Sequence, residues 1–226
     1  MPNVAIVTTV RDSLRTLKKC VNSIREHTRS DYYYIISDDS SGPETIDYLH
    51  TLKNIILIKT KGDDQCHLTE VLRKAFNKAF ELGVDYICNV ESDTYVTPDW
   101  DSQLIRALDS RLDAAGVVSV TVDYNGNLIH PSIYDLPRNY IKSWYPWKKL
   151  DKVIPSHKHI HFCGNVFRSS ACKKVDFINR NVECGIDMNY SLLLRELGYQ
   201  LYIDLGTLVY HPEPHSSRKE WKTKTQ

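Results

Sequence analysis

The sequence predicts an α/β fold in which a mostly parallel central sheet is flanked by helices. Over residues 1–100, short apolar runs typical of buried strands alternate with segments whose apolar residues recur at helical spacing. Parallel strands joined by crossover helices explain this alternation. Two of the apolar runs end in acidic residues, which places carboxylates at the carboxyl edge of the sheet, where open α/β sheets bind ligands.

The first half of the chain, residues 1–100, is expected to be regular. Its first helix begins at Asp12 or Ser13, which are suitable N-cap residues, and presents an apolar face from Leu14 to Ile24. Its third helix is expected to end just before Gly83, a glycine at the C′ position. The expected strands are residues 4–7, 32–36, 55–58 and 84–90, and the expected helices are residues 13–28, 44–52 and 67–82.

The second half, residues 101–212, has weaker periodicity. Residues 123–158 are rich in Tyr, Trp, Pro and Asn, and a loop of this length inside a compact domain is usually functional or a lid. We expect one domain over residues 1–212, with a smaller, mixed second half, followed by a polar basic tail or linker at residues 213–226. The expected helices are Trp100 to Leu108, 171–178 and 188–197, and the expected strands are 116–122, 162–167, 201–203 and 208–210.

Composition argues against several classes of function. A formal net charge of +1 gives no basis for a nucleic-acid partner. No apolar run approaches the roughly 18 residues of a transmembrane segment, and the N-terminal residues lack the layout of a signal peptide. The six cysteines are scattered without a Cys-x-x-Cys pair, which fits reduced thiols in a cytoplasmic protein better than a disulfide framework or a zinc site.

Acidic residues follow the second and fourth expected strands. Asp38 and Asp39 end one strand, and Glu91 and Asp93 follow the other with Ser92 between them. Carboxylates at a sheet edge suit a hard divalent cation such as Mg²⁺ or Mn²⁺, whose remaining positions are filled by phosphate oxygens and water. The alternatives are a solvated turn after the fourth strand and helix capping after the second.

The order of these motifs resembles that of the GT-A glycosyltransferases, most closely the family-2 type, over roughly residues 3–212. The segment 162–168 resembles that family's glycine-containing acceptor-side strand. Gly185-Ile186-Asp187 resembles its acidic catalytic motif, and Tyr210-His211 its closing histidine. The motifs of the first half that carry the resemblance are Thr8-Thr9-Val10-Arg11-Asp12, Asp38-Asp39-Ser40-Ser41 and Glu91-Ser92-Asp93.

This resemblance implies a Rossmann-like GT-A fold and a glycosyltransferase. The implied reaction moves a sugar from a nucleotide diphosphate donor, UDP by family frequency, to a hydroxyl of a glycan or other acceptor. It depends on Mn²⁺ (or Mg²⁺) and inverts the anomeric configuration. The alternatives are a non-catalytic nucleotide-sugar or glycan binding module, and a sugar-nucleotide pyrophosphorylase. The glycine-rich phosphate loop of the latter is absent, since residues 8–20 contain no glycine.

The resemblance assigns nucleotide and metal contacts to particular residues. Thr9 and Asp39 match positions that hold the base and ribose, and Asp93 and His211 match metal ligands. Glu91 departs from the family, which more often has Asp there, and His211 has the alternative of an ordinary strand-end residue. Arg73 is a diphosphate or base contact unless it is simply solvated. The full nucleotide-binding set is Thr8, Thr9, Val10, Arg11, Asp38, Asp39, Arg73, Glu91 and Ser92.

Asp187 matches the catalytic base of inverting members, which takes the proton from the acceptor hydroxyl. The family usually has Glu-Asp there, and this chain has Ile186-Asp187. The alternative is an N-cap for the following helix, and both roles can coexist. The acceptor or sugar site implied by the resemblance and the aromatic insert comprises Trp144, Trp147, Gly164 and Asn165. The two tryptophans have the alternatives of a satellite core or a membrane-interface contact.

Overall fold

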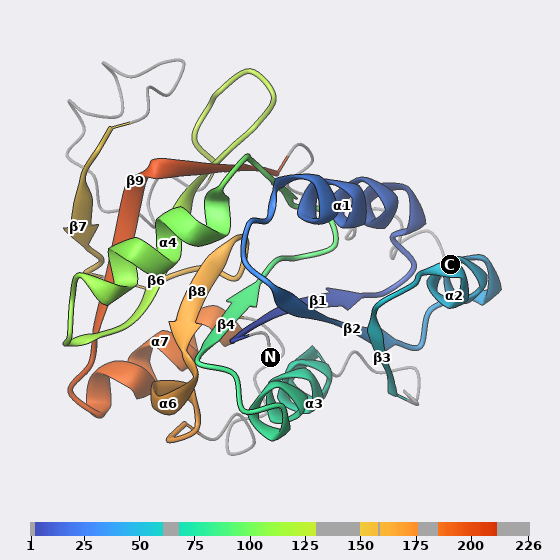
Figure 1. Ribbon diagram of the computed structural model, residues 1–226, viewed down its shortest axis with the longest axis horizontal. Coiled ribbons are helices and arrows are strands. Elements are labelled where there is room, and N and C mark those ends of the chain that lie inside the picture. Colours follow the sequence, from blue (N-terminus) through green and yellow to red (C-terminus); the bar gives the residue numbers. More distant parts are fainter. Residues whose placement is uncertain (1–2, 61–67, 130–149, 158, 176–184, 212–226) are drawn as a thin grey trace.

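The computed structural model describes residues 3–60, 68–129, 150–157, 159–175 and 185–211. In this part of the chain nine strands form one sheet, and helices cover both of its faces (Figure 1). No helix among these residues is long and apolar enough to cross a membrane. The strands are β1 (Val4–Val10), β2 (Tyr32–Asp39), β3 (Ile56–Thr60), β4 (Tyr86–Asn89), β5 (Tyr95–Val96), β6 (Ala114–Val122), β7 (Val153–Pro155), β8 (Asn165–Arg168) and β9 (Gln200–Tyr210). The helices are α1 (Leu14–His27), α2 (Pro43–Thr51), α3 (Leu68–Glu81), α4 (Trp100–Asp109), α6 (Ser169–Cys172) and α7 (Ile186–Glu196).

The strands follow the order β3-β2-β1-β4-β8-β6-β9-β5, with β7 beside β9. β1 to β4 are parallel to their neighbours in this group, which confirms the predicted βα alternation. β8 is antiparallel to both β4 and β6. β9 is parallel to β6 but antiparallel to β5 and β7. The sheet is therefore parallel in its first half and mixed in its second half, as the sequence predicts.

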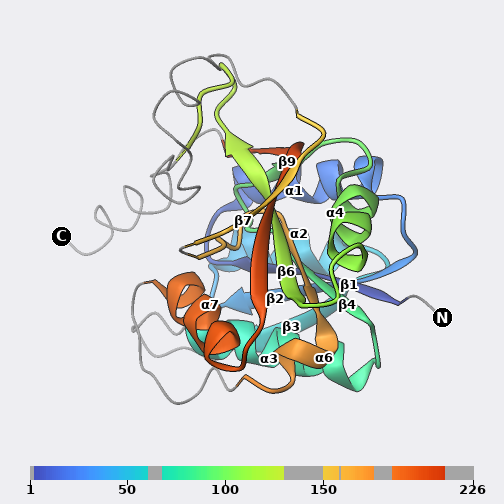
Figure 2. The ribbon, with the colours of Figure 1, turned by 90° about the vertical axis from the view of Figure 1, so that its left-hand side faces the viewer.

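Two hydrophobic layers enclose the sheet. α1, α2 and α4 pack on one face, where Leu17, Leu49 and Trp100 belong to a single cluster of buried side chains. α3, α6 and α7 pack on the other face, where the rings of Phe76 and Tyr190 meet edge to face at 6.0 Å. Figure 1 shows α1 and α4 above the sheet and α3, α6 and α7 below it, and Figure 2 shows β6 and β9 side by side.

The ends of the first helices show which capping predictions hold. Ser13 is the N-cap of α1, but its side chain makes no capping hydrogen bond, and only its carbonyl accepts from Leu17. Asp12 instead has a left-handed φ of 50° and accepts the N–H of Gly42 at 2.5 Å, so it joins the starts of α1 and α2. Gly83 follows α3 with a φ of 71°, which confirms the predicted C′ glycine.

The second half differs more from its prediction. β9 is one strand where the sequence predicts two, because a register shift against β6 lets the chain continue through Gly206. β5 and β7 are too short for a periodic pattern to indicate. α6 ends at Cys172 rather than 178, and α7 begins at Ile186 with Gly185 as its N-cap. Trp144, Trp147 and the tail 213–226 lie outside the described residues.

Candidate active site

Strand directions bring acids, a cysteine and a histidine to one edge of the sheet. β4 ends at this edge and leads into Glu91 and Asp93. β8 is antiparallel to β4 and pairs its first residue with the last residue of β4, so Cys163, just before β8, lies at the same edge. β9 is parallel to β6, which is antiparallel to β8, so His211 after β9 also reaches this edge. Residues far apart in sequence therefore meet in one site.

The short strand β5 completes this arrangement. It pairs Tyr95 with Tyr210, which places the residues before β5 opposite the residues after β9. As a result His211 Nε2 lies 3.3 Å from Asp93 Oδ1. On the other side, the Cys163 thiol donates to Glu91 Oε2 at 2.9 Å. The structure thus brings together the two predicted metal ligands, Asp93 and His211, and adds Cys163.

The donor atoms of this site fit a divalent cation. Glu91, Cys163 and His211 each offer a ligand atom, and these atoms all lie within 4.8 Å of one another. His211 is only 9% exposed, and its Nδ1 has no hydrogen-bond partner among the described residues. A buried polar atom without a partner is costly, and a bound ligand would offset that cost. Carboxylate oxygens and an imidazole are suitable ligands for the Mn²⁺ or Mg²⁺ that the resemblance implies.

The electrostatics of the site also favour a cation. Burial raises the pKa of Glu91 above its ordinary range, and the negative charges of Asp93 and Asp187 raise it further. Burial lowers the pKa of His211, but its hydrogen bond to Asp93 and the charges of Asp93 and Glu91 outweigh burial and raise the pKa overall. Both shifts reflect an excess of negative charge, which a divalent cation at this edge would neutralise.

A fixed loop before β8 positions Cys163. The Cys163 N–H donates to His161 Nδ1 at 3.2 Å, while His161 Nε2 lies 3.1 Å from the Thr121 hydroxyl oxygen. Gly164 has a φ of 70°, and a Cβ there would approach Val209 Cγ1 to 2.6 Å, so a side chain at this position is excluded. Sequence reasoning missed Cys163 and His161, although Cys163 stands beside the glycine of the recognised 162–168 segment.

The two predicted acceptor residues of this segment lie in the interior. Asn165 is fully buried, donates to the His161 carbonyl at 2.6 Å and accepts the Asn89 N–H at 3.3 Å. Gly164 accepts two hydrogen bonds from Ser119, one from its N–H and one from its hydroxyl. In this structure both residues join β4, β6 and β8 rather than facing a bound acceptor.

Asp187 stands at the start of α7. It lies inside the first turn and is not the N-cap, because Gly185 takes the cap position with a φ of 72°. Its Oδ1 accepts the N–H of Met188 at 2.9 Å, and its Oδ2 lies 3.7 Å from His159 Nε2. Since the charge of Asp187 raises the pKa of Glu91, the carboxylate lies within electrostatic reach of the candidate metal site. His159, a neighbour that orients it, was not predicted.

The predicted nucleotide residues divide into accessible and interior groups. Arg11 and Asp39, at the ends of β1 and β2, form an ion pair at 3.4 Å, with side chains 25% and 5% exposed. Thr9 is half-buried beside them, whereas Thr8 is fully buried with its hydroxyl 3.3 Å from that of Tyr34. The structure therefore offers Arg11, Asp39 and Thr9 rather than the Thr8 side chain to a ligand at this edge.

The remaining nucleotide residues have local partners. Asp38 accepts the N–H of Ser41 at 3.3 Å, so its carboxylate supports the turn before α2. Arg73 is bound by Glu70 one turn earlier on α3. Val10 is buried, and Ser92 is half-buried in the turn after β4.

An aromatic stack borders the candidate metal site and was not predicted. Tyr124 stacks on Tyr95 and on Tyr210, with ring centroids 6.3 and 6.1 Å apart. Tyr124 is 61% exposed. Because Tyr210 precedes His211, this stack offers an aromatic surface next to the site within the described residues.

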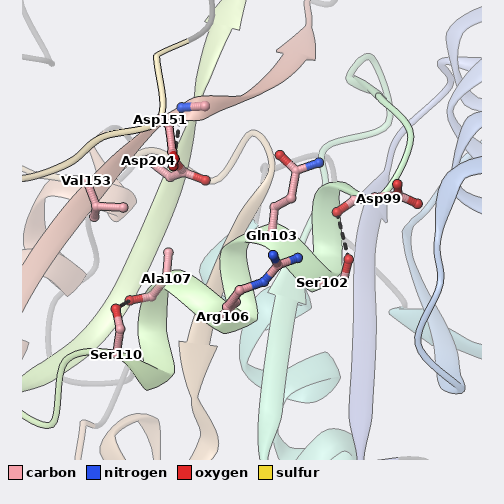
Figure 3. Close-up of a pocket in the computed structure, with 10 residues that line it drawn as sticks. Asp99, Ser102, Gln103, Arg106, Ala107, Ser110, Asp151, Val153 and Asp204 are labelled. Carbon is pink, nitrogen blue, oxygen red and sulfur yellow. Dashed lines mark hydrogen bonds between the residues drawn. The ribbon is translucent and has the colours of Figure 1, made fainter.

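A separate pocket of about 550 Å³ lies between α4 and β9 (Figure 3). Asp99, Gln103, Arg106, Asp151 and Asp204 are among the residues that line it, and none of the candidate site residues does. The Asp204 carboxylate is already occupied, since it accepts the Gly206 N–H at 2.9 Å and the Thr207 hydroxyl at 2.6 Å. We therefore do not place the active site in this pocket.

The fold defines the class of this protein as a GT-A glycosyltransferase. The model of the family described as Glycosyl transferase family 2 matches residues 4–176, and the chain belongs to this family. Two crystal structures of S. aureus TarS match with TM-scores of 0.68 and 0.65 at 12% and 11% identity. Each match covers 96% of this chain, but only 38% and 62% of the respective TarS chains.

A further similar structure is a crystal structure of GalNAc-T7 with UDP, GalNAc and Mn²⁺. It matches with a TM-score of 0.66 at 13% identity, over 94% of this chain and 44% of that chain. At such identities the likeness concerns the fold. The chain spans less than two thirds of the length of each of these structures.

Proposed function

We propose that this protein transfers a sugar from a UDP-sugar to an acceptor hydroxyl, with Mn²⁺ (or Mg²⁺) as cofactor and with inversion at the anomeric carbon. The observation that carries the proposal is the meeting of Asp93 and His211, 3.3 Å apart, at the edge where Glu91 also lies. This is the edge at which open α/β sheets bind ligands. Membership of glycosyl transferase family 2 supports the reaction class.

Asp39 and Thr9 would hold the base and ribose, with Arg11 keeping the Asp39 carboxylate in place at 3.4 Å. Asp93 and His211, with Glu91, would hold the cation, which neutralises charge on the diphosphate when bound. The choice of UDP and Mn²⁺ is supported by the GalNAc-T7 structure, which contains both.

Asp187 is the proposed general base. The acceptor hydroxyl oxygen forms a bond to the anomeric carbon, and its proton passes to the Asp187 carboxylate. The bond between that carbon and the diphosphate oxygen breaks, and its electron pair leaves with the nucleotide. Attack opposite the leaving group inverts the configuration. The contact with His159 at 3.7 Å and the hydrogen bond from Met188 hold the carboxylate in one orientation.

Two broader features remain proposals. We propose that residues 1–212 form a single catalytic domain, with residues 1–100 binding the nucleotide and residues 101–212 supplying the acceptor side. We also propose a cytoplasmic location, because the four described cysteines, Cys20, Cys88, Cys163 and Cys172, are free thiols.

Donor binding is expected to depend on the cation. Calorimetry should show UDP binding at least about tenfold more tightly with Mn²⁺ than with EDTA, because three carboxylates otherwise face the diphosphate. Asp93→Asn should lose most of this difference. Equal affinity in Mn²⁺ and EDTA would contradict the proposed bridging site.

The same proteins separate the enzyme from a binding module. A thermal-shift panel of nucleotide sugars identifies the donor, since a ligand at 100 times its dissociation constant adds about 2.7 kcal/mol of stability. Release of the nucleoside diphosphate from that donor, in the presence of candidate acceptors, then supports an enzyme. Binding without turnover over such an acceptor panel would favour the binding module.

Asp39→Ala is expected to weaken UDP binding by roughly 10- to 100-fold, the worth of a hydrogen bond to a charged group. Turnover at saturating donor should change little, because Asp39 makes the same contact in the ground and transition states. The control is Asp47→Ala, which removes an exposed carboxylate from α2. Unchanged UDP affinity combined with a large loss of turnover would refute this role.

A further inference from the structure

We propose that Cys163 is a ligand of the same cation and makes the site bind thiophilic ions such as Zn²⁺ and Cd²⁺ more tightly than Mn²⁺ or Mg²⁺. This inference rests on the proposed function only for the location of the cation. It goes beyond that function because it concerns which ions the site selects, and it introduces a ligand that the recognised motifs do not include.

The first argument is distance. Cys163 Sγ lies 2.9 Å from Glu91 Oε2, and the ligand atoms of Glu91, Cys163 and His211 lie within 4.8 Å of one another. Two ligands of one ion are separated by at most twice the bond length, or about 4.6 Å for a zinc–sulfur bond of about 2.3 Å. Small side-chain movements therefore suffice for all three residues to share an ion.

The second argument is that the thiol is held in place by the fold. His161 accepts the Cys163 N–H at 3.2 Å, and the next residue, Gly164, is fixed by hydrogen bonds from Ser119. Gly164 also lies so close to Val209 that a Cβ would approach its Cγ1 to 2.6 Å. The backbone on both sides of the sulfur is thus fixed, and a metal ligand benefits from such support.

The third argument is that other described cysteines lack these neighbours. Cys172 is fully buried in the core beneath α6, and Cys88 is fully buried within β4. Among the described residues, Cys163 is the cysteine that joins a carboxylate and an imidazole in a metal-ligating group. Its ligand partners come from separate strands, which is why cysteine spacing alone argued against a zinc site.

The fourth argument is chemical selectivity. Oxygen ligands suit Mg²⁺ and Mn²⁺, whereas a thiolate favours softer ions, and at an otherwise similar site Zn²⁺ binds more tightly than Mn²⁺. A carboxylate, an imidazole and a thiolate together make up a typical zinc donor set. Coordination requires the thiolate, so the Cys163 proton is released to solvent as the metal–sulfur bond forms. Thiophilic ions should therefore displace Mn²⁺ from this site.

The test is Cd²⁺ titration of the full chain without donor or acceptor, followed by the ultraviolet sulfur-to-cadmium charge-transfer band and by calorimetry. Cys163→Ser should remove the part of the band that saturates at the first equivalent and weaken Cd²⁺ binding at least about tenfold, while Mn²⁺ affinity changes much less. Cys172→Ser is the matched control and should retain the band. Circular dichroism confirms folding, and Cys163→Ala replaces the serine variant if that protein does not fold.

Equal bands and equal Cd²⁺ affinities in the wild-type protein and the Cys163 variants would overturn the inference. A second readout is competition: Zn²⁺ should displace bound Mn²⁺ from the wild-type protein at lower concentrations than from Cys163→Ser, as followed by Mn²⁺ electron paramagnetic resonance. These measurements need no turnover. Failure of sugar transfer would therefore leave this inference standing, and its own failure would leave the proposed transfer intact.

Discussion

Asp187→Asn is expected to lower turnover by about two to four orders of magnitude, the usual contribution of a general base, while donor affinity stays nearly unchanged. The amide cannot accept the proton of the acceptor hydroxyl. It can still accept the Met188 N–H, now at 2.9 Å, so the start of α7 should remain intact. Removing a negative charge from the first helical turn costs only about 0.3–1 kcal/mol.

The measurement is single-turnover transfer together with UDP calorimetry and thermal unfolding. Glu196→Gln provides the matched control, because it converts an exposed carboxylate to an amide at the other end of the same helix. Near-normal transfer by Asp187→Asn would leave Asp187 as a residue that stabilises the helix start and would remove the basis for inversion.

His211→Ala is expected to raise the Mn²⁺ concentration needed for half-maximal activity by at least about tenfold. The Mg²⁺ requirement should change less, because Mg²⁺ prefers oxygen ligands to imidazole. The fold should tolerate the change, since the His211 N–H donates to the Val122 carbonyl at 2.9 Å independently of the side chain. Loss of the hydrogen bond to Asp93 costs about 1 kcal/mol of stability.

Activity titrations against Mn²⁺ and Mg²⁺ check this prediction, with thermal unfolding of the metal-free proteins alongside. His50→Ala, which removes an exposed imidazole from α2, is the control and should reproduce the wild-type curves. Superimposable Mn²⁺ curves for the wild-type protein and His211→Ala would exclude His211 from the site and make it an ordinary strand-end residue.

Local pattern predicted the regular half of the fold well. The apolar face from Leu14 to Ile24 is the buried face of α1, and Gly83 follows α3 with the expected positive φ. Such features depend on spacing within one element, so they are visible in the sequence. The cap of α7 was predicted wrongly, because both Gly185 and Asp187 are plausible at a helix start and only the left-handed φ of Gly185 decides between them.

The candidate site divides in the same way. Asp93 and His211 follow strands, and their types suggested ligands, so they were predicted without the structure. Gly164 and Asn165 were predicted as acceptor contacts, yet the structure places them in the interior, where their backbone and amide groups join neighbouring strands. A residue next to a recognised motif has no local signal that tells a ligand contact from a packing role, because that depends on what lies across the sheet.

The sequence by itself determined the βα alternation, the acids at the ends of β2 and β4, and the resemblance that family membership confirms. Only the tertiary structure decided that Cys163 faces Glu91 at 2.9 Å and that His159 stands beside Asp187. The physical reason is that strand ends follow from hydrophobic runs along the chain. Which ends share an edge depends instead on the order and direction of strands, and here an antiparallel β8 between β4 and β6 completes the site.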